Sequence, residues 1–205
     1  MKRILCFGDS NTWGYKPLDG RRYDRHTRWA AKLAEHDGWE VVEEGLNGRT
    51  TVFYDSTEHY RCGLDYAEAC VLSHLPLDLI ILMLGTNDAK WKYQASAEQI
   101  RDGLEQVIDC MRESCARKGQ YPKVLIIAPP PLYMWGEDPE FDLASEGKIR
   151  ALENLYEELA ARKDCLFLRA SDAVKEIGAD GAHMTPEGHQ SLAEAVVSCL
   201  EGDAH

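Results

Sequence analysis

The 205-residue sequence lacks the short motifs with which parallel sheets commonly bind nucleotides. Neither Gly-x-Gly-x-x-Gly after the first apolar run nor Gly-x-x-x-x-Gly-Lys-Ser/Thr occurs, which argues against dinucleotide binding and P-loop phosphate binding. The Gly-x-Ser-x-Gly turn that presents the nucleophile of α/β-hydrolases is also missing. The chemistry of this chain must therefore be sought in other groups of residues.

Cysteine pairs and long apolar stretches are missing as well. The seven cysteines are odd in number, irregularly spaced and without a Cys-x-x-Cys pair, which favours reduced, buried thiols over a zinc or redox motif. The first apolar run, Ile4–Phe7, is too short for a signal peptide, and no stretch approaches membrane-spanning length. We therefore expect a cytoplasmic protein with no cofactor, no metal and no membrane partner.

Basic residues are few. The chain has 23 Lys and Arg against 35 Asp and Glu, a net charge of −12. An acidic surface repels phosphate backbones and anionic lipid, so we expect no nucleic-acid partner. The exception is the stretch 16–28, with five basic and two acidic residues. A solvated loop or a subunit contact is its favoured interpretation, and an anion site is the alternative.

The pattern of apolar residues predicts one α/β domain over residues 1–205, since no linker or repeat divides the chain. Apolar runs predict five strands, at Ile4–Phe7, Glu40–Val42, Leu77–Leu84, Val124–Ala128 and Cys165–Leu168. Helical spacing predicts helices over 97–115 with a Ser96/Gln99 capping box, over 149–159, and after Thr185-Pro186. Alternating strands and helices indicate an open parallel sheet, whose ligands bind beyond the carboxyl ends of the strands.

Three polar segments are expected at this edge: Gly8-Asp9-Ser10-Asn11-Thr12-Trp13, Gly85-Thr86-Asn87-Asp88 and Asp180-Gly181-Ala182-His183. Each alone is more often a turn, and a lone histidine is usually a surface or core residue. Together they supply a nucleophile, a base with an orienting carboxylate, and an amide donor. That combination is what acyl transfer requires.

The roles follow from the chemistry of each group. Ser10 would attack as the nucleophile, His183 would take its proton because histidine titrates near neutrality, and Asp180 would fix the imidazole tautomer. The tetrahedral intermediate needs donors for its oxyanion. The Ser10 and Gly48 backbone N–H groups and the Asn87 side chain are the candidates, Gly48 because it follows the second strand.

These segments resemble the four blocks of the SGNH (GDSL-type) hydrolases, whose letters correspond here to Ser10, Gly48, Asn87 and His183. The blocks span residues 8–183. The resemblance implies a flavodoxin-like three-layer α/β/α fold with a five-stranded parallel sheet, and a Ser-His-Asp esterase without a cofactor. Segments such as 43–51 and 129–132 are similar to the intracellular arylesterase/acyltransferase branch. This branch implies short acyl esters as small-molecule substrates, acyl transfer to alcohols or peroxide, and a homo-oligomer.

Further residues are candidates for contact with substrate: Asp9, Asn11, Trp13, Asn47, Thr86, Trp91 and Ala182. Asn11 stands where relatives often have an apolar residue and is expected to make the pocket floor polar. Tyr93 and Trp135 are further candidate walls, although aromatic side chains that simply pack or join a subunit interface are an equal alternative. Asp9 and Asp88 are expected to hold loops by accepting backbone N–H groups.

Two other functions remain open. A carbohydrate O-deacetylase of the acetylxylan type would use the same groups in a more polar cleft, consistent with Asn11. A non-catalytic binding protein on this fold would be expected to lack a member of the Ser-His-Asp set, and Ser10, His183 and Asp180 are all present. An ester hydrolase is therefore the favoured prediction.

Overall fold

The computed structural model describes residues 1–134 and 139–202, and its centre is a parallel sheet. The strands are β1 (Lys2–Gly8), β2 (Trp39–Gly45), β3 (Leu79–Met83), β4 (Lys123–Ala128) and β5 (Leu166–Arg169), in the order β2-β1-β3-β4-β5. The register sets Gly8, the last residue of β1, beside Gly45 on one side and Met83 on the other. The segments that follow these three strands therefore leave the sheet at the same edge, where the strand order reverses.

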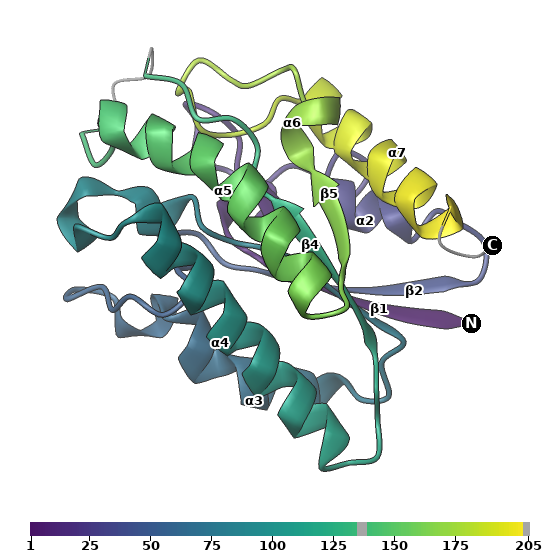
Figure 1. Ribbon diagram of the computed structural model, residues 1–205. Helices are drawn as coiled ribbons and strands as arrows, with labels where there is room; N and C mark the ends of the chain where they lie inside the picture. The colour runs from purple at the N-terminus through teal and green to yellow at the C-terminus, as the bar shows by residue number, and fades with distance from the viewer. Residues whose placement is uncertain (135–138, 203–205) are drawn as a thin grey trace.

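Helices cover both faces of the sheet (Figure 1). On one face α3 (Gly63–His74), α4 (Ala97–Ala116) and α5 (Leu143–Arg162) enclose an apolar core. On the other, α2 (Trp29–Leu33), α6 (Ala170–Ala173) and α7 (Pro186–Gly202) enclose a second core. The short helix α1 (Ser10–Trp13) follows β1, and single 3-10 turns are η1 (His59–Arg61), η2 (Asn87–Ala89) and η3 (Trp91–Tyr93). The predicted three-layer α/β/α fold is confirmed.

The local predictions differ from the structure mainly at the ends of elements. Five strands occur where five were predicted, although the second is longer than Glu40–Val42. The capping box of Ser96 and Gln99 begins α4, and Thr185 Oγ1 accepts the backbone N–H of Gly188 in the first turn of α7. Helix α3 was not predicted. Several of its buried residues are small, so the apolar pattern is weak. Within the described residues, no helix is long and apolar enough to cross a membrane.

Candidate active site

The turn after β1 places Ser10 at the open edge of the sheet. The Asp9 carboxylate accepts the backbone N–H of Asn11 at 3.0 Å and so begins α1, with Ser10 in its first turn. Burial raises the pKa of this Asp9 carboxyl group, since Asp9 is 1% exposed. The end of β2 lies against α1, and a Cβ on Gly45 would stand 2.1 Å from the backbone nitrogen of Trp13. Only glycine fits this close approach.

Ser10, His183 and Asp180 form a continuous chain of hydrogen bonds. His183 Nε2 lies 2.9 Å from Ser10 Oγ, and His183 Nδ1 lies 2.8 Å from Asp180 Oδ2. Asp180 Oδ1 also accepts the backbone N–H groups of Ala182 and His183. Burial alone would raise the pKa of Asp180, but the hydrogen bonds from His183 outweigh it and hold the pKa below its ordinary value. The carboxylate therefore stays ionised beside the imidazole.

Two further residues hold this histidine in place. The Tyr15 ring lies against the His183 imidazole, with centroids 4.3 Å apart. Asn11 bonds to both sides of His183, because its Nδ2 donates to the Ala182 carbonyl at 3.1 Å and its Oδ1 accepts the Met184 N–H at 3.0 Å. Tyr15 was not predicted from the sequence, since nothing in a short polar stretch shows which way one ring points.

The segments after β2 and β3 carry two of the candidate oxyanion donors, Gly48 and Asn87, into the same region. The Asn87 Nδ2 group donates to the backbone carbonyl of Arg49 at 3.1 Å, which fixes the amide and leaves its second hydrogen for a ligand. Gly48 has a φ of +77°, and a Cβ there would meet Arg61 Nε at 2.4 Å. This position therefore favours glycine for its backbone conformation, whereas the flexible Arg61 side chain can move aside.

Buried polar side chains support the segment that contains Gly48. Arg49 is 3% exposed, donates to the Gly8 carbonyl at 3.1 Å and lies over the Phe7 ring. Asp88 is fully buried and accepts both the backbone N–H and the hydroxyl of Thr51. Burial raises the pKa of Asp88 to about 6, although the bonds from Thr51 act in the opposite direction. Asp88 thus holds a loop, as expected.

Ser10 opens onto a cleft of about 220 Å³. Six further predicted residues line it together with Ser10: Asn47, Gly48, Thr86, Asn87, Ala182 and His183. Four lining residues were not predicted as members of this cleft: Tyr15, Arg61, Lys90 and Phe141. Both cations of the cleft are paired, Arg61 with Asp55 at 3.0 Å and Lys90 with Glu140. The cleft therefore mixes polar and apolar walls, and acidic partners offset its positive charges.

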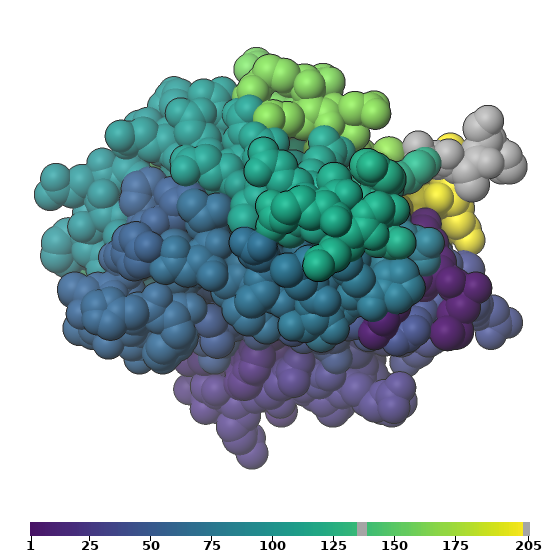
Figure 2. All heavy atoms as spheres, turned by 90° about the horizontal axis from the view of Figure 1, so that it is seen from below, coloured from purple at the N-terminus to yellow at the C-terminus, as the bar shows by residue number. Residues whose placement is uncertain are grey.

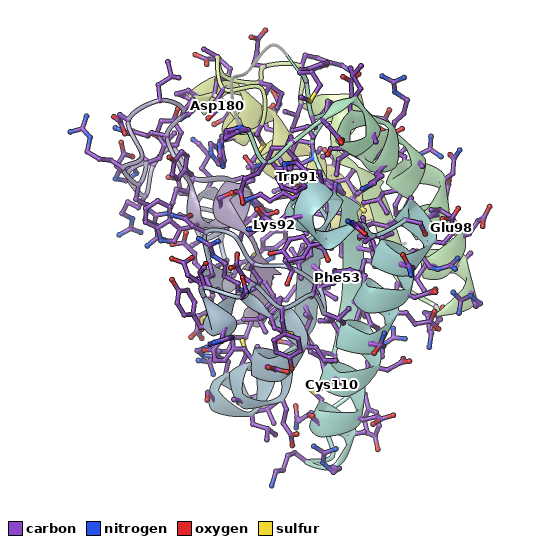
Figure 3. The ribbon with its side chains drawn as sticks, turned by 90° about the vertical axis from the view of Figure 1, so that its left-hand side faces the viewer. Phe53, Trp91, Lys92, Glu98, Cys110 and Asp180 are labelled. Carbon is purple, nitrogen blue, oxygen red and sulfur yellow. The ribbon has the colours of Figure 1, made fainter. Side chains whose placement is uncertain are left out.

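Four predicted substrate contacts do not line this cleft, so their placement is corrected. Asp9 and Asn11 are 1% and 2% exposed because they bond to backbone groups behind Ser10. The Trp13 ring lies under the Arg22 guanidinium. Trp91 is 54% exposed, and its Nε1 donates to the Pro139 carbonyl. Figure 3 looks onto the edge to which β1 runs, where Trp91 and Asp180 both lie.

The remaining aromatic candidates and the basic stretch lie elsewhere. Tyr93 packs against the core beneath α4, and Trp135 lies outside the described residues. In the stretch 16–28, Arg22 and Arg28 both pair with Glu43. Much of the positive charge of this stretch is thus offset by neighbouring carboxylates, which supports a solvated loop over an anion site.

Comparison with known proteins places this chain among ester hydrolases. The model of the GDSL-like lipase/acylhydrolase family matches residues 6–191. The structure of Est24, a carbohydrate acetylesterase from Sinorhizobium meliloti, is 34% identical with a TM-score of 0.93, covering 98% of this chain and 99% of that one. The native aryl esterase of M. smegmatis is 36% identical with a TM-score of 0.92 over the same shares.

Among curated proteins, an acetylxylan esterase of Xylanibacter ruminicola is 24% identical over 220 residues, which cover 97% of this chain and 43% of that protein. This chain thus spans less than half the length of that relative. The parallel sheet and its match to these structures define the protein as a carboxylic ester hydrolase with the SGNH hydrolase fold. The chain belongs to the GDSL-like lipase/acylhydrolase family.

Proposed function

We propose that this esterase hydrolyses short-chain carboxylic esters, aryl or alkyl acetates above all, with Ser10 as its nucleophile. The observation that carries the proposal is the unbroken chain of hydrogen bonds from Ser10 through His183 to Asp180, at the wall of a cleft. Gly48 and Asn87 line the same cleft, so donors and nucleophile converge on one small volume.

In the proposed reaction, Ser10 Oγ attacks the ester carbonyl while its proton passes to His183 Nε2. The negative charge that develops on the carbonyl oxygen is stabilised by the backbone N–H groups of Ser10 and Gly48 and by the free hydrogen of Asn87 Nδ2. His183 then gives its proton to the leaving alkoxide, and an acyl-serine remains. Asp180 stays ionised throughout and stabilises the imidazolium.

A second half-reaction releases the acid. Water, activated by the now neutral His183, attacks the acyl-serine, and collapse of the second tetrahedral intermediate returns the proton to Ser10. An alcohol or peroxide in the place of water would give acyl transfer instead. Adding an alcohol acceptor during ester turnover and measuring the ratio of new ester to free acid tests this branch of the proposal.

The size of the cleft supports a short acyl group. Ligand pockets commonly have volumes of roughly 300–1,000 Å³, and this cleft has about 220 Å³. Tyr15 and Phe141 supply its aromatic walls, while Asn47 and Thr86 supply polar ones. An acetyl or similarly small acyl group fits these walls better than a long chain does.

The direct test compares p-nitrophenyl acetate hydrolysis by the wild type and Ser10→Ala. We expect kcat to fall by about 10⁴–10⁶-fold, as for the loss of a serine nucleophile in other hydrolases. Ser198→Ala is the matched control, because Ser198 lies exposed on α7, and it should retain full activity. Equal activity in Ser10→Ala and the control would refute the proposal.

A carbohydrate O-deacetylase is the second candidate. The ion-paired groups of the cleft at Arg61 and Lys90 suit hydroxyl-rich substrates. The similar proteins include a carbohydrate acetylesterase and an acetylxylan esterase. The same Ser10 machinery would act on both substrate classes. Values of kcat/KM for acetylated xylo-oligosaccharide and for aryl acetate, measured side by side, decide between them.

A further inference from the structure

A second group of reactive side chains lies away from the catalytic cleft, between the end of β2 and α3. It consists of Glu44, Cys70 and His74, and their carboxylate oxygen, sulfur and imidazole nitrogen all lie within 4.8 Å of one another. Figure 2 views the molecule from the side on which α3 lies, drawn in blue. None of the three residues lines the cleft around Ser10.

The fold brings these groups together for simple reasons. Cys70 and His74 are four residues apart on α3, so they share one helix face. Glu44 lies two residues after Val42 on β2, and Val42 packs against the core that α3 covers, so both side chains leave the strand on that side. His74 Nε2 already lies 2.8 Å from Glu44 Oε1.

We propose that Glu44, Cys70 and His74 bind a divalent transition-metal ion of the zinc type. Thiolate, imidazole and carboxylate are the ligands that zinc takes in proteins, at about 2.0–2.3 Å, whereas Mg²⁺ and Ca²⁺ prefer oxygen alone. At those lengths tetrahedral ligand atoms stand roughly 3–4 Å apart, so small side-chain rotations close the site.

Metal binding exchanges existing interactions in a defined way. The Cys70 thiol releases its proton to solvent as the sulfur–metal bond forms, and the His74–Glu44 hydrogen bond is replaced by a bond from each residue to the ion. One thiolate and one carboxylate then offset the two charges of the ion. The charge of the ion needs this compensation because a positive charge is already close by: the Arg49 guanidinium donates to the backbone carbonyl of Glu44.

On the Glu44 side, the proposed site borders a cavity that can supply a fourth ligand. Glu44 and His74 are only partly buried, whereas Cys70 is fully buried. Glu44 also lines a cavity of about 620 Å³ together with Arg49, His59, Tyr60 and Tyr66, from which water can complete the coordination. The sequence led us to expect no metal because it has no Cys-x-x-Cys pair, and Glu44 is too distant from Cys70 in the chain to appear in a motif.

Cobalt is the sharpest probe, because a thiolate bound to Co²⁺ gives a charge-transfer absorption band that a carboxylate or imidazole does not. Wild-type protein, first treated with a chelator, is titrated with Co²⁺, and Zn²⁺ affinity is measured by competition with a chromophoric chelator. We expect one equivalent to bind with the thiolate band. Cys70→Ser should abolish the band, and His74→Gln should weaken Zn²⁺ binding by at least about tenfold.

Cys110→Ser is the matched control, since Cys110 is a half-buried thiol on the adjacent helix α4. It should leave the band and the affinity unchanged. His74→Gln changes a partly exposed residue, so it keeps the test valid if the buried Cys70 variant does not fold. Absence of a thiolate band in the wild type, or Zn²⁺ affinity unchanged in His74→Gln, overturns the proposal. Esterase activity, which requires none of the three residues, reports that each variant is folded.

Discussion

The side chain of Asn11 provides a stringent test of how the histidine segment is held. Asn11→Ala removes two buried hydrogen bonds and leaves the Ala182 carbonyl and the Met184 N–H without their partner. Ala182 and Met184 are 6% and 0% exposed, so water reaches these groups poorly. At about 1–3 kcal/mol for each unsatisfied buried group, we expect a loss of about 2–6 kcal/mol in the free energy of unfolding.

The same substitution should affect kcat rather than KM. His183 lies between the two residues that Asn11 holds, and a misplacement of about 1 Å at a reacting group can lower the rate by about 100-fold. Asn11 does not line the cleft, so substrate binding should change little. A rise in KM at constant kcat would instead show that Asn11 contacts substrate, as we expected from the sequence.

The assays are denaturant unfolding and steady-state kinetics with an aryl acetate. Asn154→Ala is the control, because Asn154 is exposed on α5 and accepts one bond from Arg169. Its effect should stay within about 0.5 kcal/mol, as is usual at surfaces. The reasoning is refuted if Asn11→Ala unfolds at the wild-type denaturant concentration and retains its kcat.

Three further predictions concern the groups around Ser10. Asp180→Asn should lower kcat by about 10⁴-fold in ester hydrolysis because the imidazole loses its tautomer-fixing partner, and an undiminished kcat would contradict the role of Asp180. Asn87→Ala should lower kcat by roughly 100–1,000-fold because the oxyanion loses one of its donors; stopped-flow ester turnover measures the loss. Burial raises the pKa of Asp88 to about 6 in the folded protein, above the pKa of an aspartate in the unfolded chain. The contribution of Asp88 to the free energy of unfolding is therefore complete below about pH 4 and is lost as the pH rises through about 6. Asp88→Asn keeps an acceptor for Thr51 and should remove this pH dependence from the unfolding free energy, whereas an unchanged profile would place the titration elsewhere.

The sequence allowed the fold to be predicted, and with it the meeting of Ser10, Asn87 and His183 at one edge of the sheet, because both are encoded locally. Leu79–Met83 is apolar throughout, as a strand buried on both faces must be. Ser10, Asn87 and His183 lie in short contiguous blocks, and parallel strands bring the ends of those blocks to one edge. Placing these three blocks at one edge required only the order of the strands and helices, and no knowledge of individual side-chain contacts.

Other parts of the site depend on contacts that no local pattern reveals. Arg61 and Lys90 reach the cleft from short 3-10 turns and their flanks, whose placement depends on ion pairs with Asp55 and Glu140. Asn11 was expected in the pocket floor, whereas its side chain bonds to Ala182 and Met184; α1 is a single turn and has no amphipathic pattern that would show this. The direction of its side chain is decided by the segment 182–184, which is distant in sequence.

The supporting contacts also connect the four blocks to one another in series. Asn11 in the first block holds the segment around His183 in the last, and Asn87 in the third bonds to the carbonyl of Arg49 beside Gly48 in the second. Arg49 in turn donates to the carbonyl of Gly8, at the start of the first block. These supporting bonds leave the reacting groups available, since Asn87 Nδ2 uses one hydrogen for the Arg49 carbonyl and keeps the other for the oxyanion of the proposed reaction. It follows that disturbing any one support should displace groups in two blocks, and that paired variants such as Asn11→Ala with Asn87→Ala should show non-additive losses in kcat.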